Sequence, residues 1–306
     1  MNRLVAIIGP TAIGKSRLAF HLAQDFNAEI VSADSRQVYR YMDIGTAKPT
    51  REELSVVPHH LIDTITPSED FSLGQYQRLA GKAIESIQQR GRLPLLVGGS
   101  GLYVWAVLEG WQIPRVPPDT EFRARMEKQV AQFGIDRLYK ELVRIDPLAA
   151  KGIDPRNVRR VIRALEINRH VRVPVRELRG KGMISDNCLI IGLTADRTEI
   201  YRRTDARVDD MIDRGFVAEV KKLLGMGYGL ELPAMSGIGY KQIGRYLLGE
   251  FDLAKAIEQI KVETHRLVRH QYNWFRLKDE RIHWFDIKND VVAEASRLVE
   301  ELLTGI

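Results

Sequence analysis

The sequence has 306 residues, of which 44% are apolar and 28% are charged. A chain of this length holds two ordinary domains, or one domain with a large insertion. These proportions exclude wholesale disorder, and a single cysteine excludes an internal disulfide and a cysteine-based zinc site. Because the sequence has no run of eighteen uncharged apolar residues and no apolar leader before its first glycine motif, we expect no membrane span, no secretory signal and a cytoplasmic protein.

The first predicted feature is a phosphate-binding loop. An apolar run at 4–8 predicts a buried strand, and a helical pattern begins at Lys15. The segment GPTAIGKS at 9–16, which connects the strand to the helix, matches GxxxxGK[ST]. In this setting backbone N–H groups and a helix N-terminus surround a di- or triphosphate. The Lys15 ammonium would face the terminal phosphates and the Ser16 hydroxyl would reach Mg²⁺. The loop therefore predicts binding of a phosphate chain.

The next hundred residues alternate strands with helices. Apolar runs at 29–32 and 93–97 predict buried strands, and amphipathic periodicity predicts helices at 15–26 and 75–90. Strands separated by helices of ten or more residues indicate a parallel sheet. We therefore predict an α/β fold of the P-loop NTPase type, with helices on both faces of the sheet.

A basic segment interrupts this pattern. Pro114, Pro117 and Pro118 mark a hinge, and the residues from 119 to about 181 are helix-periodic with no convincing strand. Residues 113–182 hold 17 Lys/Arg against 9 Asp/Glu, whereas the rest of the chain holds 29 against 31. Such a balance is typical of a module that binds a polyanion, although charge alone fits a solvated helical face equally well.

A strand is expected again at 188–193, followed by helices to the C-terminus. The predicted organisation is a P-loop core interrupted by an all-helical insertion. Its boundaries are 1–114 for the first part of the core, 115–184 for the insertion and 185–306 for the second, mostly helical part of the core.

The phosphate loop lacks the usual second acid. A P-loop ATPase normally carries a carboxylate at the end of another core strand, where it holds the Mg²⁺ shell. The strand at 93–97 runs instead into Gly-Gly-Ser-Gly, and the carboxylate at a strand end is Asp34. This pattern weakens an ATPase interpretation and suits an enzyme that needs neither an activated water nor a γ-phosphate clamp.

Eight ordered segments resemble one known family, the tRNA dimethylallyltransferases, which are isopentenyltransferases of adenosine 37. The resemblance runs from residue 9 to about residue 275. The segments are GPTAIGKS at 9–16, SADSRQVY at 32–39, MDIGTAKP at 42–49, PHHLID at 58–63, LVGGSGLY at 96–103, RALE at 163–166, GYK at 239–241 and QYNWF at 271–275.

The resemblance implies transfer of a dimethylallyl group from dimethylallyl diphosphate to N6 of an adenine beside the anticodon, with Mg²⁺ as cofactor. Asp34 would take the N6 proton, while Lys15 and the loop amides would stabilise the departing diphosphate. The catalytic residues implied are Asp34, Lys15 and Ser100, and the Mg²⁺ ligand is Ser16. The diphosphate-binding residues implied are Gly9, Pro10, Thr11, Ala12, Ile13, Gly14, Lys15 and Ser16.

The resemblance also implies a tRNA anticodon stem-loop as partner, and we expect the protein to be a monomer. Stacked adenine must leave the anticodon loop to reach such a site. The tRNA-binding residues implied are Asp34, Ser35, Arg36, Gln37 and Ser100 at the base pocket, Arg123, Arg159, Arg160, Val161, Ile162 and Arg163 in the insertion, and Gly239, Tyr240 and Lys241 near the C-terminus. An aromatic ring beside these glycines is suited to stack on a base, although a glycine-rich motif of this kind, taken alone, is more often the N-terminal turn of a helix.

Helical periodicity supports part of this assignment independently. It places Arg156, Arg159, Arg160 and Arg163 on one face, and Val158, Val161, Ile162 and Leu165 on the opposite, packing face. We expect the arginine face to bind phosphates.

Several positions depart from the family pattern or invite another interpretation. Ser100 stands where many members carry threonine, and either hydroxyl can form the same hydrogen bond. His265 and His270 stand where an arginine is common; if those arginines contact the diphosphate or the tRNA backbone, the histidines make a weaker and more pH-sensitive contact. His59 and His60 have no third ligand at a sensible spacing, so we expect hydrogen-bonding roles for both.

Three other functions fit parts of the sequence. A P-loop kinase explains the loop and the parallel core but not the basic insertion. A non-catalytic, nucleotide-gated RNA-binding protein explains the arginine face, and its tRNA would remain unmodified. A prenyltransferase acting on free AMP or ADP has the same chemistry but little use for a basic insertion of some seventy residues.

Overall fold

The computed structural model describes residues 3–114, 116–170 and 187–305. The chain divides into two compact units, which we call the core unit (Met1–Val107 with Ser185–Ile306) and the insertion unit (Leu108–Ile184). The sequence placed the first boundary slightly later, between 114 and 115. The second expected boundary, between 184 and 185, lies outside the described residues.

The core unit is built on one sheet of six parallel strands, in the order β3-β2-β4-β1-β5-β6. The central strand β1 pairs with β4 and β5, with Val5 opposite both Leu95 and Leu189. The strands are β1 Leu4–Ile8, β2 Ala28–Ser32, β3 His59–His60, β4 Leu93–Gly98, β5 Cys188–Thr194 and β6 His283–Asp286. This arrangement confirms the predicted parallel α/β fold.

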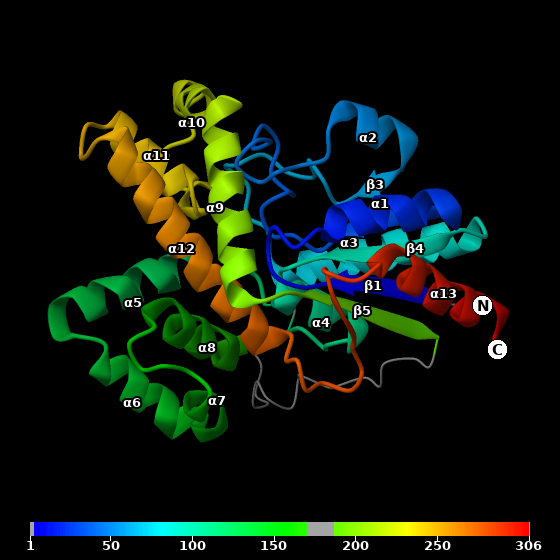
Figure 1. Ribbon diagram of the computed structural model, residues 1–306. Helices are drawn as coiled ribbons and strands as arrows, with labels where there is room; N and C mark the ends of the chain where they lie inside the picture. The colour runs from blue at the N-terminus through cyan, green and yellow to red at the C-terminus, as the bar shows by residue number, and fades with distance from the viewer. Residues whose placement is uncertain (1–2, 115, 171–186, 306) are drawn as a thin grey trace. The chain divides into compact units, whose positions relative to one another are not determined.

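Helices cover both faces of this sheet (Figure 1). On one face, Val5 and Ile7 of β1 pack against Leu18 and Leu22 of α1, and α13 joins the same cluster. Figure 1 shows α4 on the other side of the strands. The core-unit helices are α1 Lys15–Asp25, α2 Arg51–Val56, α3 Leu73–Gln89, α4 Gly101–Leu108, α9 Arg197–Asp213, α10 Phe216–Gly225, the short 3₁₀ helix η1 Ala234–Ser236, α11 Tyr240–Leu247, α12 Leu253–Trp274 and α13 Val291–Thr304.

The expectation that the chain is helical from residue 194 to its end was wrong at one element. His283–Asp286 forms the edge strand β6, which pairs with β5 from Ile191 to Thr194. Its four residues, HWFD, contain neither an apolar run nor a clear alternation, so periodicity does not identify it. The pairing comes from β5, whose buried edge needs a hydrogen-bonding partner.

The described part of the insertion unit is helical, as predicted. Its helices are α5 Thr120–Phe133, α6 Asp136–Ile145, α7 Pro147–Lys151 and α8 Val158–His170. They share one small hydrophobic cluster that includes Phe122, Leu142 and Leu165. None of the helices in the described ranges of either unit has the length and apolar character of a membrane span.

Candidate active site

The phosphate loop lies between β1 and α1 at the carboxyl end of the sheet. Gly9 has a φ of +141°, and a Cβ there would lie 2.5 Å from the carbonyl oxygen of Leu193, so only glycine fits. Gly14, with a φ of +106°, turns the chain into α1, which begins at Lys15. The loop therefore places its backbone beside the N-terminus of α1, which is the arrangement on which the prediction of phosphate binding depends.

Lys15 and Arg207 concentrate positive charge at this loop. The Lys15 Nζ donates to the Pro10 carbonyl at 2.6 Å. Burial and the neighbouring Arg207 guanidinium lower the pKa of Lys15 to about 7, against the opposing effect of Asp34. Because Arg207 and burial both disfavour the charged form of Lys15, an anion bound at this loop would favour that charged form.

Arg207 is a site residue that the sequence motifs did not predict. It projects from α9, and its Nη1 lies 3.4 Å from the Thr11 hydroxyl of the phosphate loop. Burial lowers the pKa of Arg207, while the carboxylates of Asp34 and Asp210 act in the opposite direction. Its position is the feature that points to it: Arg207 is a charged residue on the helix face that carries the buried residues Thr204 and Val208, and a charged residue is unusual on a packed face.

Asp34 follows β2 and Ser100 follows β4, and the parallel pairing of these strands brings the two residues to the same edge of the sheet. One carboxylate oxygen of Asp34 accepts the Arg36 N–H at 2.8 Å. The Ser100 hydroxyl accepts the Ser35 N–H at 3.0 Å and donates to the Ser35 hydroxyl at 3.3 Å. Ser100 thus fixes the turn that carries Asp34.

Gln271, near the end of α12, connects the phosphate loop to the glycine turn after β4. Its Oε1 accepts the Thr11 N–H at 2.9 Å and its Nε2 donates to the Gly99 carbonyl at 3.1 Å. A Cβ on residue 99 would lie 2.3 Å from that nitrogen, so Gly99 makes room for the bridge. The QYNWF segment hinted at a role for Gln271, but its place in the site was not predicted from the sequence.

All of these groups face one cavity of about 480 Å³ in the core unit. This volume lies in the range of sites for small molecules and cofactors. The cavity is lined by these charged and polar groups and also by apolar side chains, which include Leu102 and Trp274. The predicted or newly found polar residues that line it are Thr11, Lys15, Ser16, Asp34, Ser35, Arg36, Gln37, Ser100, Arg207 and Gln271.

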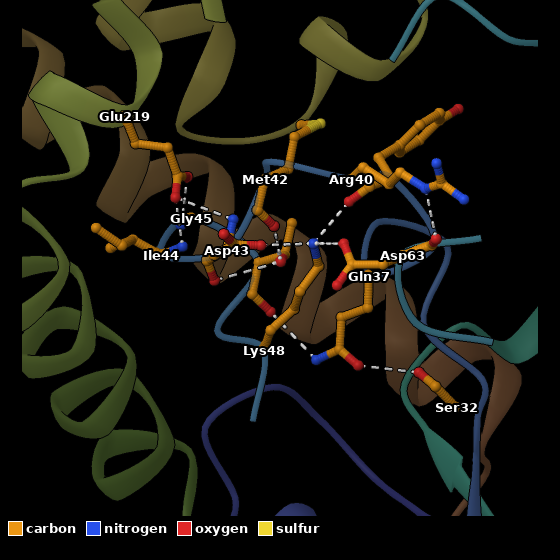
Figure 2. A network of polar contacts seen from close by, with 12 residues as sticks. Ser32, Gln37, Arg40, Met42, Asp43, Ile44, Gly45, Lys48, Asp63 and Glu219 are labelled. Carbon is orange, nitrogen blue, oxygen red and sulfur yellow. Dashed lines mark hydrogen bonds and ion pairs between the residues drawn. The ribbon is translucent and has the colours of Figure 1, made fainter. Parts of the chain in front are cut away.

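Gln37 and Arg36 are held by the protein at the rim of this cavity. Gln37 accepts from the Ser32 hydroxyl at 2.9 Å and donates to the Thr46 and Ala47 carbonyls at 3.3 Å each (Figure 2). The Arg36 guanidinium donates to the Pro233 carbonyl at 2.9 Å. Both residues are therefore oriented by the protein itself.

Tyr240 does not stand where the sequence pattern placed it. Its side chain is 1% exposed, its hydroxyl donates to Glu219 at 2.6 Å and its ring meets Phe216 edge-on. The expected stacking of Tyr240 on a base was wrong, because the ring belongs to the core. Gly239 lines the cavity and Lys241 is exposed beside it on α11.

The insertion residues separate into two groups. Arg159 and Arg160 are exposed on α8, whereas Val161 and Ile162 are 0% and 3% exposed inside the hydrophobic cluster. The prediction that Val161 and Ile162 contact tRNA through their side chains is therefore wrong. Helical periodicity had already placed both residues on the packing face.

Arg123 and Arg163 also have partners within the insertion unit. Both guanidinium groups donate to Glu166, and Arg163 additionally donates to the Val116 carbonyl at 2.9 Å. The arginine face of α8 therefore presents Arg159 and Arg160 outward, while Arg163 is bound to Glu166.

His59 and His60 are hydrogen-bonded side chains, as expected. His60 pairs with the buried Glu29 at 2.6 Å, and His59 lines the cavity with a pKa lowered by burial. His265 pairs with Asp205 at 2.8 Å, and His270 lines the cavity.

The donor set at the cavity fits Mg²⁺ bound mainly through a substrate. Among the described residues no group of three His, Cys, Asp or Glu side chains gathers at one point. The Ser16 hydroxyl is exposed at the first turn of α1, and Mg²⁺ usually takes few protein ligands together with phosphate oxygens and water.

Comparison with known families gives one match. The model of the IPP transferase family matches residues 37–278. A tRNA dimethylallyltransferase of Dehalococcoides mccartyi is 48% identical over 300 residues, which cover 98% of this chain and 92% of that protein. A tRNA dimethylallyltransferase of a Roseiflexus species is 52% identical over 276 residues, covering 90% of each chain.

Solved structures agree with this match. A full-length tRNA isopentenylpyrophosphate transferase from Bacillus halodurans has a TM-score of 0.73 and 42% identity, covering 100% of this chain and 98% of its own. A eukaryotic dimethylallyltransferase acting on tRNA has a TM-score of 0.81 and 26% identity, covering 99% of this chain and 79% of its own.

Proposed function

The chain belongs to the IPP transferase family, and we propose that it transfers a dimethylallyl group from dimethylallyl diphosphate to N6 of adenosine 37 in cytoplasmic tRNA, releasing diphosphate. One observation carries the proposal at the level of the site. Lys15 of the phosphate loop, the Arg207 guanidinium and the Asp34 carboxylate face the same cavity. An enzyme that removes a diphosphate from carbon and a proton from nitrogen needs both the cations and the carboxylate.

The phosphate loop would hold the diphosphate as a leaving group. As the bond between C1 of the dimethylallyl group and its oxygen breaks, negative charge grows on the diphosphate. The loop N–H groups, Lys15 and Arg207, which lie together at the phosphate loop, would stabilise this charge. Mg²⁺ would be held by Ser16 and the diphosphate oxygens, and it supplies additional charge neutralisation there.

Asp34 would act on the acceptor. Adenine N6 is a weak nucleophile because its lone pair is delocalised into the ring. The Asp34 carboxylate accepts a hydrogen bond from N6–H and takes the proton as N6 bonds to C1. General-base assistance of this kind contributes roughly 10²- to 10⁴-fold.

The insertion would bind the tRNA backbone. Arg159 and Arg160 are exposed cations on a segment whose net charge is strongly positive. Free AMP offers no counterpart for such a surface, which favours tRNA over a mononucleotide as acceptor. This contribution is independent of the anticodon sequence, so the base pocket must supply the specificity.

Nucleoside mass spectrometry tests the proposal directly. Unmodified tRNA is incubated with the protein, Mg²⁺ and dimethylallyl diphosphate, then digested, and the expected result is a C5H8 gain on adenosine that requires the diphosphate. A gain on AMP but not on tRNA would move the acceptor to free nucleotides. No gain on either, with phosphoryl transfer from ATP, would favour a kinase.

Asp34→Ala and Asp34→Asn separate catalysis from binding. We expect both variants to lose most turnover and to keep tRNA affinity nearly unchanged, since the carboxylate acts on one proton. An unchanged rate in these variants would contradict the general-base role. If the wild type and both variants all bind tRNA but leave it unmodified, the protein is better described as a non-catalytic RNA-binding protein.

A further inference from the structure

The loop 36–48, which separates the Asp34 turn from α2, has a strained backbone. Tyr41 and Ala47 have φ values of +69° and +46°, and Leu61 and Asp63 in the adjoining segment have values of +63° and +52°. These are four of the six non-glycine residues with positive φ in the described chain. Each costs of order 1 kcal/mol and persists only where the surroundings enforce it.

Lys48 enforces one part of this shape. Its Nζ donates to the Tyr39 carbonyl at 2.7 Å, to Asp43 at 2.7 Å and to Asp63 at 2.6 Å, and its side chain is 4% exposed (Figure 2). All three N–H donors of the ammonium are thus used. One buried lysine ties the two ends of the loop to the segment around Asp63.

Glu219 enforces the other part from α10. One carboxylate oxygen accepts the N–H groups of Asp43 and Ile44 at 2.9 and 2.7 Å, and the other accepts that of Gly45 at 3.2 Å (Figure 2). The Tyr240 hydroxyl adds a fourth bond at 2.6 Å. Charge-assisted bonds of this kind are the stronger class of hydrogen bond.

Gly45 shows how closely the loop approaches the helices that hold it. A Cβ on residue 45 would lie 2.3 Å from the Phe216 ring and 2.6 Å from the Tyr240 ring. Gly45 and Thr46 line the active-site cavity, whereas Lys48 and Glu219 belong to the layer behind it. Any effect of these two charged residues on substrate must pass through the loop.

Gln37 is the point at which the loop meets the cavity. Its Nε2 faces the carbonyls of Thr46 and Ala47, which can only accept, so this amide nitrogen is fixed by the loop. Its Oε1 accepts from Ser32 and retains a lone pair. The position of 46–47, and hence the shape enforced by Lys48 and Glu219, sets the direction of that oxygen.

We propose that Lys48 and Glu219 are positioning residues that hold the loop 36–48 in the shape that orients Gln37 toward the acceptor base. The proposal rests on the transfer reaction proposed above. Because neither residue contacts the phosphate loop, their loss disturbs the acceptor and not the donor. A misplacement of about 1 Å in a reacting group costs roughly 10²-fold in rate.

Three variants test this role: Lys48→Met, Glu219→Gln and Tyr240→Phe. The matched controls are Lys261→Met, whose ammonium pairs with Asp209 at 2.7 Å, and Glu199→Gln, whose carboxylate binds Arg202 and Arg203. For each protein, one measures the single-turnover rate at saturating tRNA, the affinity for dimethylallyl diphosphate and the thermal midpoint.

We expect Lys48→Met and Glu219→Gln to lower the single-turnover rate by roughly 10- to 100-fold while the diphosphate affinity stays within about twofold. Tyr240→Phe, which keeps its buried ring and removes one of four bonds to Glu219, should lower the rate by a few fold. Both controls should keep the wild-type rate.

Two outcomes would overturn the proposal. One is a wild-type rate in all three variants. The other is a parallel loss of rate and diphosphate affinity that follows the thermal midpoint in variants and controls alike, which is the mark of a purely structural role. An inactive wild type would instead refute the transfer reaction, and the two failures are therefore distinguishable.

Discussion

Arg123 and Glu166 form a two-point ion pair inside the insertion unit. The guanidinium Nε and Nη2 donate to the two carboxylate oxygens at 2.9 and 2.8 Å. Glu166 is 0% exposed and also accepts the Asp119 N–H at 2.7 Å, so it joins the start of α5 to α8. A residue expected to contact tRNA thus has a second task, which is to keep the insertion folded.

Glu166→Gln should destabilise the insertion. The substitution removes the buried charge that pairs with Arg123 and Arg163, and because these arginine side chains are 36% and 33% exposed, the loss of the charged hydrogen bonds costs about 1 to 3 kcal/mol. Urea unfolding of the full chain checks this. The control Glu127→Gln changes an exposed carboxylate on α5 and should stay within about 0.5 kcal/mol of the wild type. Equal unfolding midpoints would contradict the structural role of Glu166.

The same carboxylate predicts acid sensitivity. Burial alone would raise the pKa of Glu166, but hydrogen bonds from Arg123, Arg163 and the Asp119 N–H outweigh it and lower the pKa to about 2. The stabilisation is therefore complete above the ordinary value near 4.5 and is lost as the pH falls toward 2. Stability measured between about pH 7 and about pH 3 should fall more steeply in the wild type than in Glu166→Gln. Parallel curves would show that another group dominates.

Local sequence was enough for the parts of the site that depend on local structure. The phosphate loop could be predicted because a strand, GxxxxGK[ST] and a helix are contiguous, and the positions of Gly9 and Gly14 follow from that geometry. Asp34 could be singled out because it follows a predicted strand, whereas its role as a general base came from the resemblance. The loop and the place of Asp34 need only short-range pattern.

The missed features depend on contacts between distant segments. Gln271 meets Thr11 across 260 positions, and Arg207 meets it across 196. Tyr240 looks like a free aromatic in a glycine-rich turn, and its burial becomes visible only in its contacts with Phe216 and Glu219 on α10. Resemblance assigned the range 159–163 as a block, and burial divides that block into surface arginines and core side chains.

Diphosphate binding should weaken as the pH rises through neutrality. Burial and Arg207 lower the pKa of Lys15 to about 7, so the free enzyme loses the Lys15 charge above that pH. Affinity for inorganic diphosphate, measured by calorimetry between about pH 6 and about pH 9, should fall over this range, although deprotonation of the ligand adds negative charge and acts in the opposite direction. In Lys15→Met the affinity for diphosphate should be lower at every pH, and the fall caused by deprotonation of Lys15 should be absent. If the two proteins show the same profile, another group accounts for it.

The salt dependence of tRNA binding should identify which arginines bind phosphate. The slope of log affinity against log salt is negative, and removing one phosphate-binding cation reduces its magnitude by about 0.7 to 0.9. Arg159→Ala with Arg160→Ala removes two exposed guanidinium groups, so the magnitude should decrease by up to twice that amount while the unfolding midpoint is unchanged. Arg297→Ala on α13 removes an exposed arginine of the core unit and serves as the control. Arg163→Ala should act differently, because its guanidinium binds Glu166, and the main effect should be reduced stability. A double variant that keeps the wild-type slope would show that this face of α8 does not lie on the tRNA backbone.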